Sequence, residues 1–160
     1  MRTYRQIKGL PVFELGTAAA IGSITDLSIS QNSQVTGFLM DGKGFFQRDR
    51  FIPLEAVHSI GNDGVFVTSR EALKPAALVK QNLFLETHKP LYNKAVYNSS
   101  GDKLGLLNDV YFSAELGTIE AYELTDGFFA DLSEGKKRVH PSDGNFTVSK
   151  DAIVMNAITE

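Results

Sequence analysis

Two aspartates are the side chains whose type and spacing come closest to acid–base chemistry. Asp26 and Asp109 each end an aliphatic-Gly-x-aliphatic-x-Asp stretch, which begins at Ile21 in the first case and at Leu104 in the second. A pair of carboxylates about 5 to 10 Å apart is the arrangement used by hydrolases of glycosidic bonds. Because the two stretches lie far apart in the chain, that pairing requires their domains to face each other. We keep a hydrolase as an alternative and favour a structural role, in which each Asp accepts backbone N–H groups.

The other residue types that carry chemistry form no such constellation. The chain has no Cys, which excludes disulfides, thiolate metal ligands and a cysteine nucleophile. His58, His88 and His140 lack the spacing of a metal site. No Ser lies in a Gly-x-Ser-x-Gly setting, and Gly42-Lys43-Gly44 lacks the strand-to-helix context of a phosphate loop. We therefore expect no enzyme, no metal and no cofactor.

Composition and charge are those of an ordinary globular protein. Of 160 residues, 42% are hydrophobic and 22% are charged, and the net charge is −3. Residues 1–80 hold nine Lys and Arg against seven Asp and Glu, whereas residues 81–160 hold seven against twelve. A uniformly basic nucleic-acid footprint is therefore absent. The basic N-terminus leads into no apolar segment of membrane-spanning length, so we expect a cytoplasmic protein.

An internal repeat organises the chain. The stretch from Ile21 to Ser30 returns as Leu104 to Ser113, with apolar residues at alternate positions as in a half-buried strand. Further matches lie 84 residues apart: Ile7 with Leu91, Val12 with Val96, Phe13 with Tyr97, Val35 with Ile119 and Phe38 with Tyr122. The offset is 83 between Phe45 and Phe128 and grows to 88 between Pro53 and Pro141, which places an insertion of 88 − 83 = 5 residues within 130–137 of the second copy.

Short strands separated by Gly, Asp and Asn turns predict a small β-barrel in each copy. In the first copy we expect strands over 9–15, 21–30, 35–40, 51–54 and 65–67. The predicted fold class is thus mainly β, with two tandem small β-barrels, over 1–68 and 91–160. A partly helical connector over 69–90 joins them, and a capping box from Thr68 to Glu71 begins its first turn.

These motifs resemble the PRC-barrel domain family. Aliphatic-Gly-x-aliphatic-x-Asp, a strand ending in Pro and a final aliphatic-Gly-x-Asp-x-Val-x-Val occur over Ile7 to Thr68 and, in related form, over Leu91 to Met155. The structural repeat positions are Gly22, Asp26, Pro53, Gly105, Asp109 and Pro141. Members of this family include a subunit of the photosynthetic reaction centre and a ribosome maturation factor. The resemblance implies a non-catalytic adaptor fold that is used in quite different settings.

Two kinds of residue are candidates for partner binding. The aromatic pairs that follow turns are anchors for a protein partner, and they are Phe45, Phe46, Phe128 and Phe129. The basic residues near the corresponding loops suit an anionic partner, and they are Arg48, Arg50, Lys136, Lys137 and Arg138. We expect an adaptor that binds another protein. An RNA- or ribosome-associated factor is the alternative, and the oligomeric state is left open.

Overall fold

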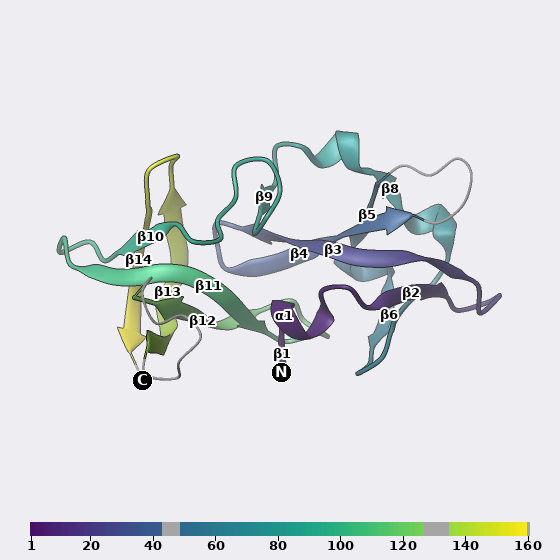
Figure 1. Ribbon diagram of the computed structural model, residues 1–160, viewed down its shortest axis with the longest axis horizontal. Helices are drawn as coiled ribbons and strands as arrows, with labels where there is room; N and C mark the ends of the chain where they lie inside the picture. The colour runs from purple at the N-terminus through teal and green to yellow at the C-terminus, as the bar shows by residue number, and fades with distance from the viewer. Residues whose placement is uncertain (43–48, 127–134, 160) are drawn as a thin grey trace.

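The computed structural model describes residues 1–42, 49–126 and 135–159 and is mainly β (Figure 1). The first half contains β1 (Arg2–Thr3), α1 (Tyr4–Ile7), β2 (Pro11–Glu14), β3 (Ala20–Ser30), β4 (Gln34–Gly42), β5 (Arg50–Pro53), the 3-10 turn η1 (Leu54–Ala56), β6 (Val57–Ile60) and β7 (Val65–Val67). Next come η2 (Arg70–Ala72), β8 (Lys74–Pro75), η3 (Ala76–Val79) and β9 (Leu83–Phe84). The second half contains β10 (Ala95–Tyr97), β11 (Lys103–Phe112), β12 (Ile119–Thr125), β13 (Lys136–Val148) and β14 (Ile153–Thr159). Among the described residues, no helix has the length and apolarity needed to cross a membrane.

The second half closes into a five-stranded barrel. Its strands follow the order β11-β10-β14-β13-β12, and β12 pairs back with β11. All of these pairings are antiparallel except that of β10 with β14. Closure removes the exposed edges that a small open sheet would leave. The predicted barrel is therefore confirmed here.

The first half uses the same plan with one strand broken. Its sheet runs β6-β7-β2-β3-β4-β5-β8, so β5 and β6 lie near opposite ends of the order. The turn η1 joins them directly, and Pro53 stands at its N-terminus. In the second half the same region is the single strand β13, whose pairing with β14 changes register after Pro141. A proline at each of these points is compatible with the bend because it has no N–H to give to a sheet ladder.

The strand register confirms the repeat. Parallel pairing joins Val12 to Val65 in the first half and Val96 to Ile153 in the second. These four residues are related by the offsets of 84 and 88 that the sequence predicted, as 96 − 12 = 84 and 153 − 65 = 88. The second copy is therefore 88 − 84 = 4 residues longer between its paired strands, and the additional length leaves the barrel plan intact.

Strand β3 is more buried than its alternating pattern predicted. Asp26, Leu27, Ser28 and Ile29 are all buried, although successive side chains point to opposite faces of the sheet. Strand β9 pairs with this part of β3, and buried Leu39, Phe51 and Phe84 form a second cluster apart from the main core. The expectation of a half-buried strand was thus wrong for this part, because the connector covers the outer face.

The start of the connector is capped by a different residue from the one predicted. The Ser69 hydroxyl accepts the Glu71 N–H at 3.2 Å and begins η2. The Thr68 hydroxyl instead donates to the Ala56 carbonyl at 3.5 Å. Glu14 fixes this turn, since its carboxylate accepts the Arg70 N–H at 2.8 Å and pairs with the Arg70 guanidinium at 3.2 Å.

The two halves meet about an approximate two-fold axis. Gln34 and Thr118, which are equivalent under the offset of 84, form an antiparallel bridge with each other. Two equivalent backbone hydrogen bonds flank it, from Val35 N–H to Gly117 O at 2.6 Å and from Ile119 N–H to Ser33 O at 3.0 Å. Reciprocal contacts of this kind define the isologous interface of a symmetric dimer. Here both partners belong to one chain.

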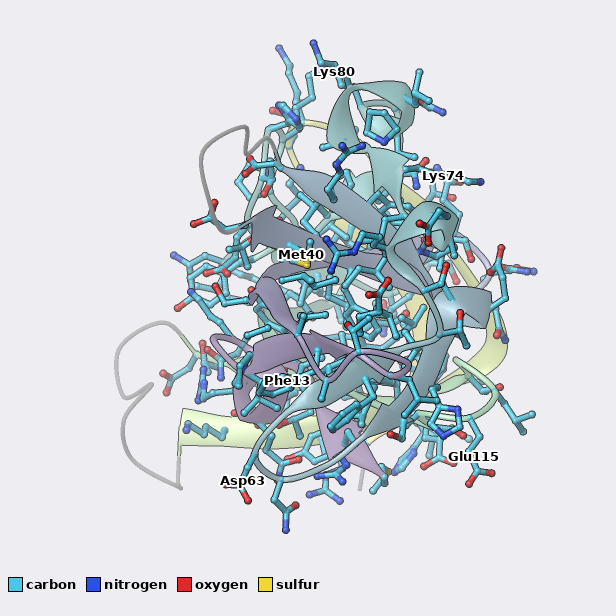
Figure 2. The ribbon with its side chains drawn as sticks, turned by 90° about the vertical axis from the view of Figure 1, so that its right-hand side faces the viewer. Phe13, Met40, Asp63, Lys74, Lys80 and Glu115 are labelled. Atoms are coloured by element: carbon cyan, nitrogen blue, oxygen red, sulfur yellow. The ribbon has the colours of Figure 1, made fainter. Side chains whose placement is uncertain are left out.

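Each half also lends a strand to the other. Strand β1 begins the first half but pairs with β11 of the second, and β9, near the end of the connector, pairs with β3 of the first. Figure 1 shows β1 and α1 between the two sheets. One hydrophobic core contains buried residues of both halves, and the rings of Phe38 and Phe112 lie 6.1 Å apart across the junction. Met40 belongs to this core, whereas the exposed Asp63 lies at the periphery of the molecule (Figure 2).

Gly22 and Gly105 lie where β3 and β11 pass closest to a neighbouring strand. A Cβ atom on Gly22 would be 2.3 Å from the carbonyl oxygen of Asp41, and one on Gly105 would be 2.8 Å from that of Thr125. A backbone carbonyl in a sheet cannot move aside as a flexible side chain can. We expect Gly22→Ala and Gly105→Ala each to lower the free energy of unfolding by about 2 kcal/mol or more, measured by urea denaturation.

Gly16→Ala is the matched control, because nothing lies within 4 Å of the added atom. We expect that variant to stay within about 0.5 kcal/mol of wild type. Equal urea midpoints for Gly22→Ala and Gly16→Ala would contradict the close approach of the strands.

The Glu14 carboxylate predicts an acid dependence. The Arg70 N–H, the Arg70 guanidinium and the Thr17 hydroxyl lower the pKa of Glu14 to about 2, although burial opposes them. The ionised carboxylate therefore stabilises the fold fully above its usual pKa of about 4.5, and this stabilisation is lost as the pH falls towards 2. We expect the melting temperature of Glu14→Gln to lie below wild type at neutral pH and to converge with it in acid. Glu115→Gln is the control, and a Glu14→Gln deficit that is independent of pH would refute this reasoning.

Candidate functional site

The carboxylate of Asp109 holds the N-terminal segment of the other half. On β11, Asp109 is 2% exposed, and its Oδ1 accepts the N–H of Tyr4 at 3.0 Å and that of Val110 at 2.8 Å. Its Oδ2 accepts the Arg5 N–H at 3.3 Å. Tyr4 and Arg5 begin α1, where the first N–H groups have no partner within the helix. Asp109 thus satisfies donors that would otherwise be buried without an acceptor.

Asp26 does the same for the segment that precedes the second half. It is fully buried on β3, and its Oδ1 accepts the N–H of Leu27 at 2.7 Å and that of Glu86 at 3.1 Å. Its Oδ2 accepts the Thr87 hydroxyl. The two equivalent aspartates therefore tether the two equivalent segments across the approximate two-fold axis.

A polar network lies between these tethers. The Tyr4 hydroxyl is 2.5 Å from Glu86 Oε2 and 2.8 Å from the Thr25 carbonyl oxygen, two acceptors that share its proton. Lys8 Nζ pairs with Glu86 Oε1 at 2.7 Å. The network connects α1 of the first half with the last residues of the connector. It therefore reinforces the same junction as the aspartates.

Burial governs the protonation of these groups. It raises the pKa of Asp26 and Asp109 above the usual value, outweighing the donors around each carboxylate. Burial also raises the pKa of Tyr4, and the Glu86 carboxylate adds to this effect. Burial would raise the pKa of Glu86 as well, but hydrogen bonds from Lys8 and Tyr4 outweigh it and the net shift is downward. Tyr4 is therefore a persistent donor and a poor nucleophile.

A small hollow of about 170 Å³ opens beside the network, and Arg5, Lys8, Tyr92 and Asn108 are among its lining residues. Pockets for drug-sized ligands typically measure roughly 300 to 1,000 Å³, so this one suits only a small ion or solvent. The oxygens of Asp109, which also borders it, are engaged by N–H groups. The alternative of a hydrolase therefore lacks a free carboxylate in this arrangement.

Several of the predicted binding residues lie outside the described part of the chain. These are Phe45, Phe46, Arg48, Phe128 and Phe129, and most of the predicted insertion lies there with them. Their predicted role as anchors or anion contacts stays a prediction.

The remaining predicted basic residues lie on two different sheets. Arg50 is exposed at the start of β5, and Lys137 is exposed on β13. Lys136 pairs with Glu123 at 3.7 Å. The guanidinium carbon of Arg138 lies 4.1 Å from the centre of the Tyr111 ring, a cation–π contact. Two of these cations therefore already have partners within the second barrel.

The histidines occupy separate places. His58 is on β6, His88 is in the loop before β10, and His140 is on β13 with Nδ1 2.8 Å from the Glu120 carbonyl oxygen. Within residues 1–42, 49–126 and 135–159, no three His, Asp or Glu side chains gather in a way that could hold a metal ion.

Comparison with known families identifies the domain family of the two halves. The sequence profile of the PRC-barrel domain matches residues 1–74 and again residues 87–160. The chain belongs to the PRC-barrel family. The tandem PRC-barrel repeat that the sequence predicted is thus confirmed. The chain is also 35% identical over 159 residues to "Uncharacterized protein YrrD" of Bacillus subtilis (strain 168), which covers 98% of this chain and 88% of that protein.

The sequence predicted the two aspartates but missed their partners. Tyr4, Lys8 and Glu86 carry no motif, and Glu86 lies 60 residues from Asp26 along the chain. One signal was available: the segments that contact the aspartates immediately precede the first matched residues of each copy, Ile7 and Leu91. In a symmetric pair, such equivalent segments can be exchanged between copies at little cost.

Reciprocal tethering makes a specific prediction for two variants. Asp109→Ala removes the acceptor of the Tyr4 and Arg5 N–H groups, and Asp26→Ala removes that of the Glu86 N–H. We expect each to cost about 2 to 3 kcal/mol of unfolding free energy, because buried donors lose their acceptor. In hydrogen exchange, Asp109→Ala should expose the amides of Tyr4 and Arg5, whereas Asp26→Ala should expose that of Glu86.

Asp63→Ala is the control, since Asp63 is exposed in the turn between β6 and β7. Identical loss of protection at both segments in both variants would show that the carboxylates act only through global stability. That result would refute separate tethers.

Proposed function

We propose that this chain is a non-catalytic adaptor of the cytoplasm that binds another protein. The observation that supports this best is the use of the two motif aspartates: both hold the halves together, and neither is left free for acid–base chemistry. The result is a rigid body with one shared core, suited to presenting surfaces in fixed relation. PRC-barrel membership supports a non-catalytic module.

The outer face of β14 is the described surface that best suits a protein partner. Ile153 and Met155 point into the barrel, whereas Val154 and Ile158 are 39% and 65% exposed. Tyr97 lies beside Val154 on the paired strand β10. Exposed aliphatic side chains on a rigid strand provide contact area with little entropy lost on binding. We assign the partner contact to this face, together with the predicted aromatic pairs.

Affinity purification of the tagged full chain, at about 100 mM and about 500 mM salt, tests the proposal. Contacts driven by apolar burial persist at high salt, whereas phosphate contacts weaken. We expect a stoichiometric protein partner at both salt concentrations, lost in Ile158→Asp and retained in Ser100→Asp. Ser100 is exposed in the turn before β11 and serves as the matched control.

Absence of any stoichiometric protein would overturn the adaptor proposal. Ribosomal RNA that disappears at high salt, and also in the double variant Arg50→Glu with Lys137→Glu, would instead favour the alternative through these two residues. Circular dichroism of Ile158→Asp must match wild type, so that loss of the partner reports the surface and not the fold.

A further inference from the structure

A continuous track of hollows runs along the connector and the start of the second half. The largest, about 560 Å³, is lined in part by Lys89, Lys94 and Lys150. A hollow of about 200 Å³ shares these three lysines, and one of about 330 Å³ shares Lys89 and adds Lys80. The small hollow beside the junction shares Tyr92 with the largest. We call this surface, defined by the four lysines and Tyr92, the lysine track.

The charges of the lysine track are not neutralised by the protein. In the described part of the chain, ion pairs involve Lys8, Arg70 and Lys136 and none of the four track lysines. Asp151 is the acidic residue among those that line the three lysine hollows. This concentration of positive charge stands in a chain whose net charge is −3.

The internal repeat shows that the fold does not require a lysine at two of these four positions. Lys94 occupies the position of Leu10 in the first half, under the offset of 84, and Lys150 occupies that of Asn62, under the offset of 88. Both halves nevertheless form the same strand pairings around these positions. Lys89 matches Arg5 at the offset of 84, so the cations particular to the second half are Lys94 and Lys150, which indicates a role for these two other than folding.

The shape of the lysine track favours an extended polyanion. The hollows adjoin one another through shared lining residues, from the connector to the turn between β13 and β14, which suits an extended ligand. Lys94 Nζ donates to the Ser149 carbonyl at 2.7 Å, which holds one positive charge against the wall. Lys80 projects into solvent at the outer part of the connector (Figure 2).

Tyr92 favours nucleic acid over an acidic peptide. Tyr92 is 46% exposed and borders the largest of these hollows. Unpaired bases stack on exposed aromatic rings while lysines neutralise the phosphates, and this combination is typical of single-strand binding. The exposed amide side chain of Gln81 borders the adjoining hollow and can bond to a base edge, whereas the Asn82 amide donates to the Ser28 hydroxyl at 3.3 Å.

We propose that the lysine track binds single-stranded nucleic acid, with RNA as the probe of choice. Lys80, Lys89, Lys94 and Lys150 contact successive phosphates, and Tyr92 stacks on a base. This surface is separate from the outer face of β14. The inference does not depend on the proposed protein partner, and its test uses the purified chain alone.

Fluorescence anisotropy with a labelled 12-nucleotide oligouridine tests the proposal. For wild type we expect the logarithm of the binding constant to fall with the logarithm of salt concentration with a slope of about −2 to −3, as three or four phosphate contacts predict. The double variant with Lys89→Glu and Lys150→Glu should bind at least about tenfold more weakly. Lys74→Glu with Lys103→Glu makes the same change in net charge at exposed positions outside the track and should bind within about threefold of wild type.

Tyr92→Ala separates stacking from charge. Loss of one stacked base should weaken binding about 5- to 150-fold while leaving the salt slope unchanged. A smaller slope in this variant would indicate that the track had been distorted and would count against the stacking assignment. Circular dichroism and urea midpoints of all variants establish that they fold.

Three outcomes would overturn the inference. The first is no oligouridine binding at about 50 mM salt, where electrostatic binding is strong. The second is equal loss of binding in the track and control double variants. The third is binding of phosphatidylglycerol vesicles or polyglutamate that needs Lys89 and Lys150 while oligouridine does not, because the track would then recognise another class of polyanion.

Discussion

The antiparallel bridge between Gln34 and Thr118 sets the constraint on which the rest of the structure depends. Equivalent residues can pair with each other only near a two-fold axis, so the backbone contacts that flank the bridge occur in equivalent pairs. Each half matches a domain of 74 residues, a size at which a single core is only marginally sufficient. The shared core lets the apolar residues of one half shield those of the other. Because β1 and β9 pair with strands of the opposite half, separating the halves would break the backbone hydrogen bonds of these strand pairs.

Burying a carboxylate costs desolvation free energy, and the two buried aspartates offset part of this cost by binding N–H groups. The exchanged segments arrive with N–H groups that lack a partner in their own segment, at the buried start of α1 and at the partly buried Glu86. A carboxylate oxygen accepts several such donors at once and bonds them more strongly than a neutral carbonyl does. Burial nevertheless raises the pKa of both Asp26 and Asp109, so the donors offset the cost of desolvation only in part. The two aspartates that resemble an acid–base pair in sequence therefore serve to hold the two halves together.

Much of the fold was accessible from the sequence because local spacing and the repeat both carry it. The offsets placed the parallel strand pairs, and Gly22 and Gly105 marked the close approach of backbones. The partners of the aspartates could not be predicted from the sequence. Two separate barrels in series and two barrels that exchange segments would show the same sequence repeat. The burial of Ser28 on the outer face of β3 depends on β9, which is only two residues long and leaves no pattern.

The lysine track was missed for a related reason: its cations are spread from Lys80 to Lys150 and only the fold gathers them. The covalent fusion allows the second half to carry Lys94 and Lys150 where the first half carries no cation. In a homodimer, any substitution appears on both sides of the axis and must be tolerated twice. In a fused pair, one copy can replace Leu10 by its equivalent Lys94 while the other keeps the apolar residue. Because the interface is symmetric but the sequence is not, one chain can hold a stable two-fold core and still present a different surface on each side.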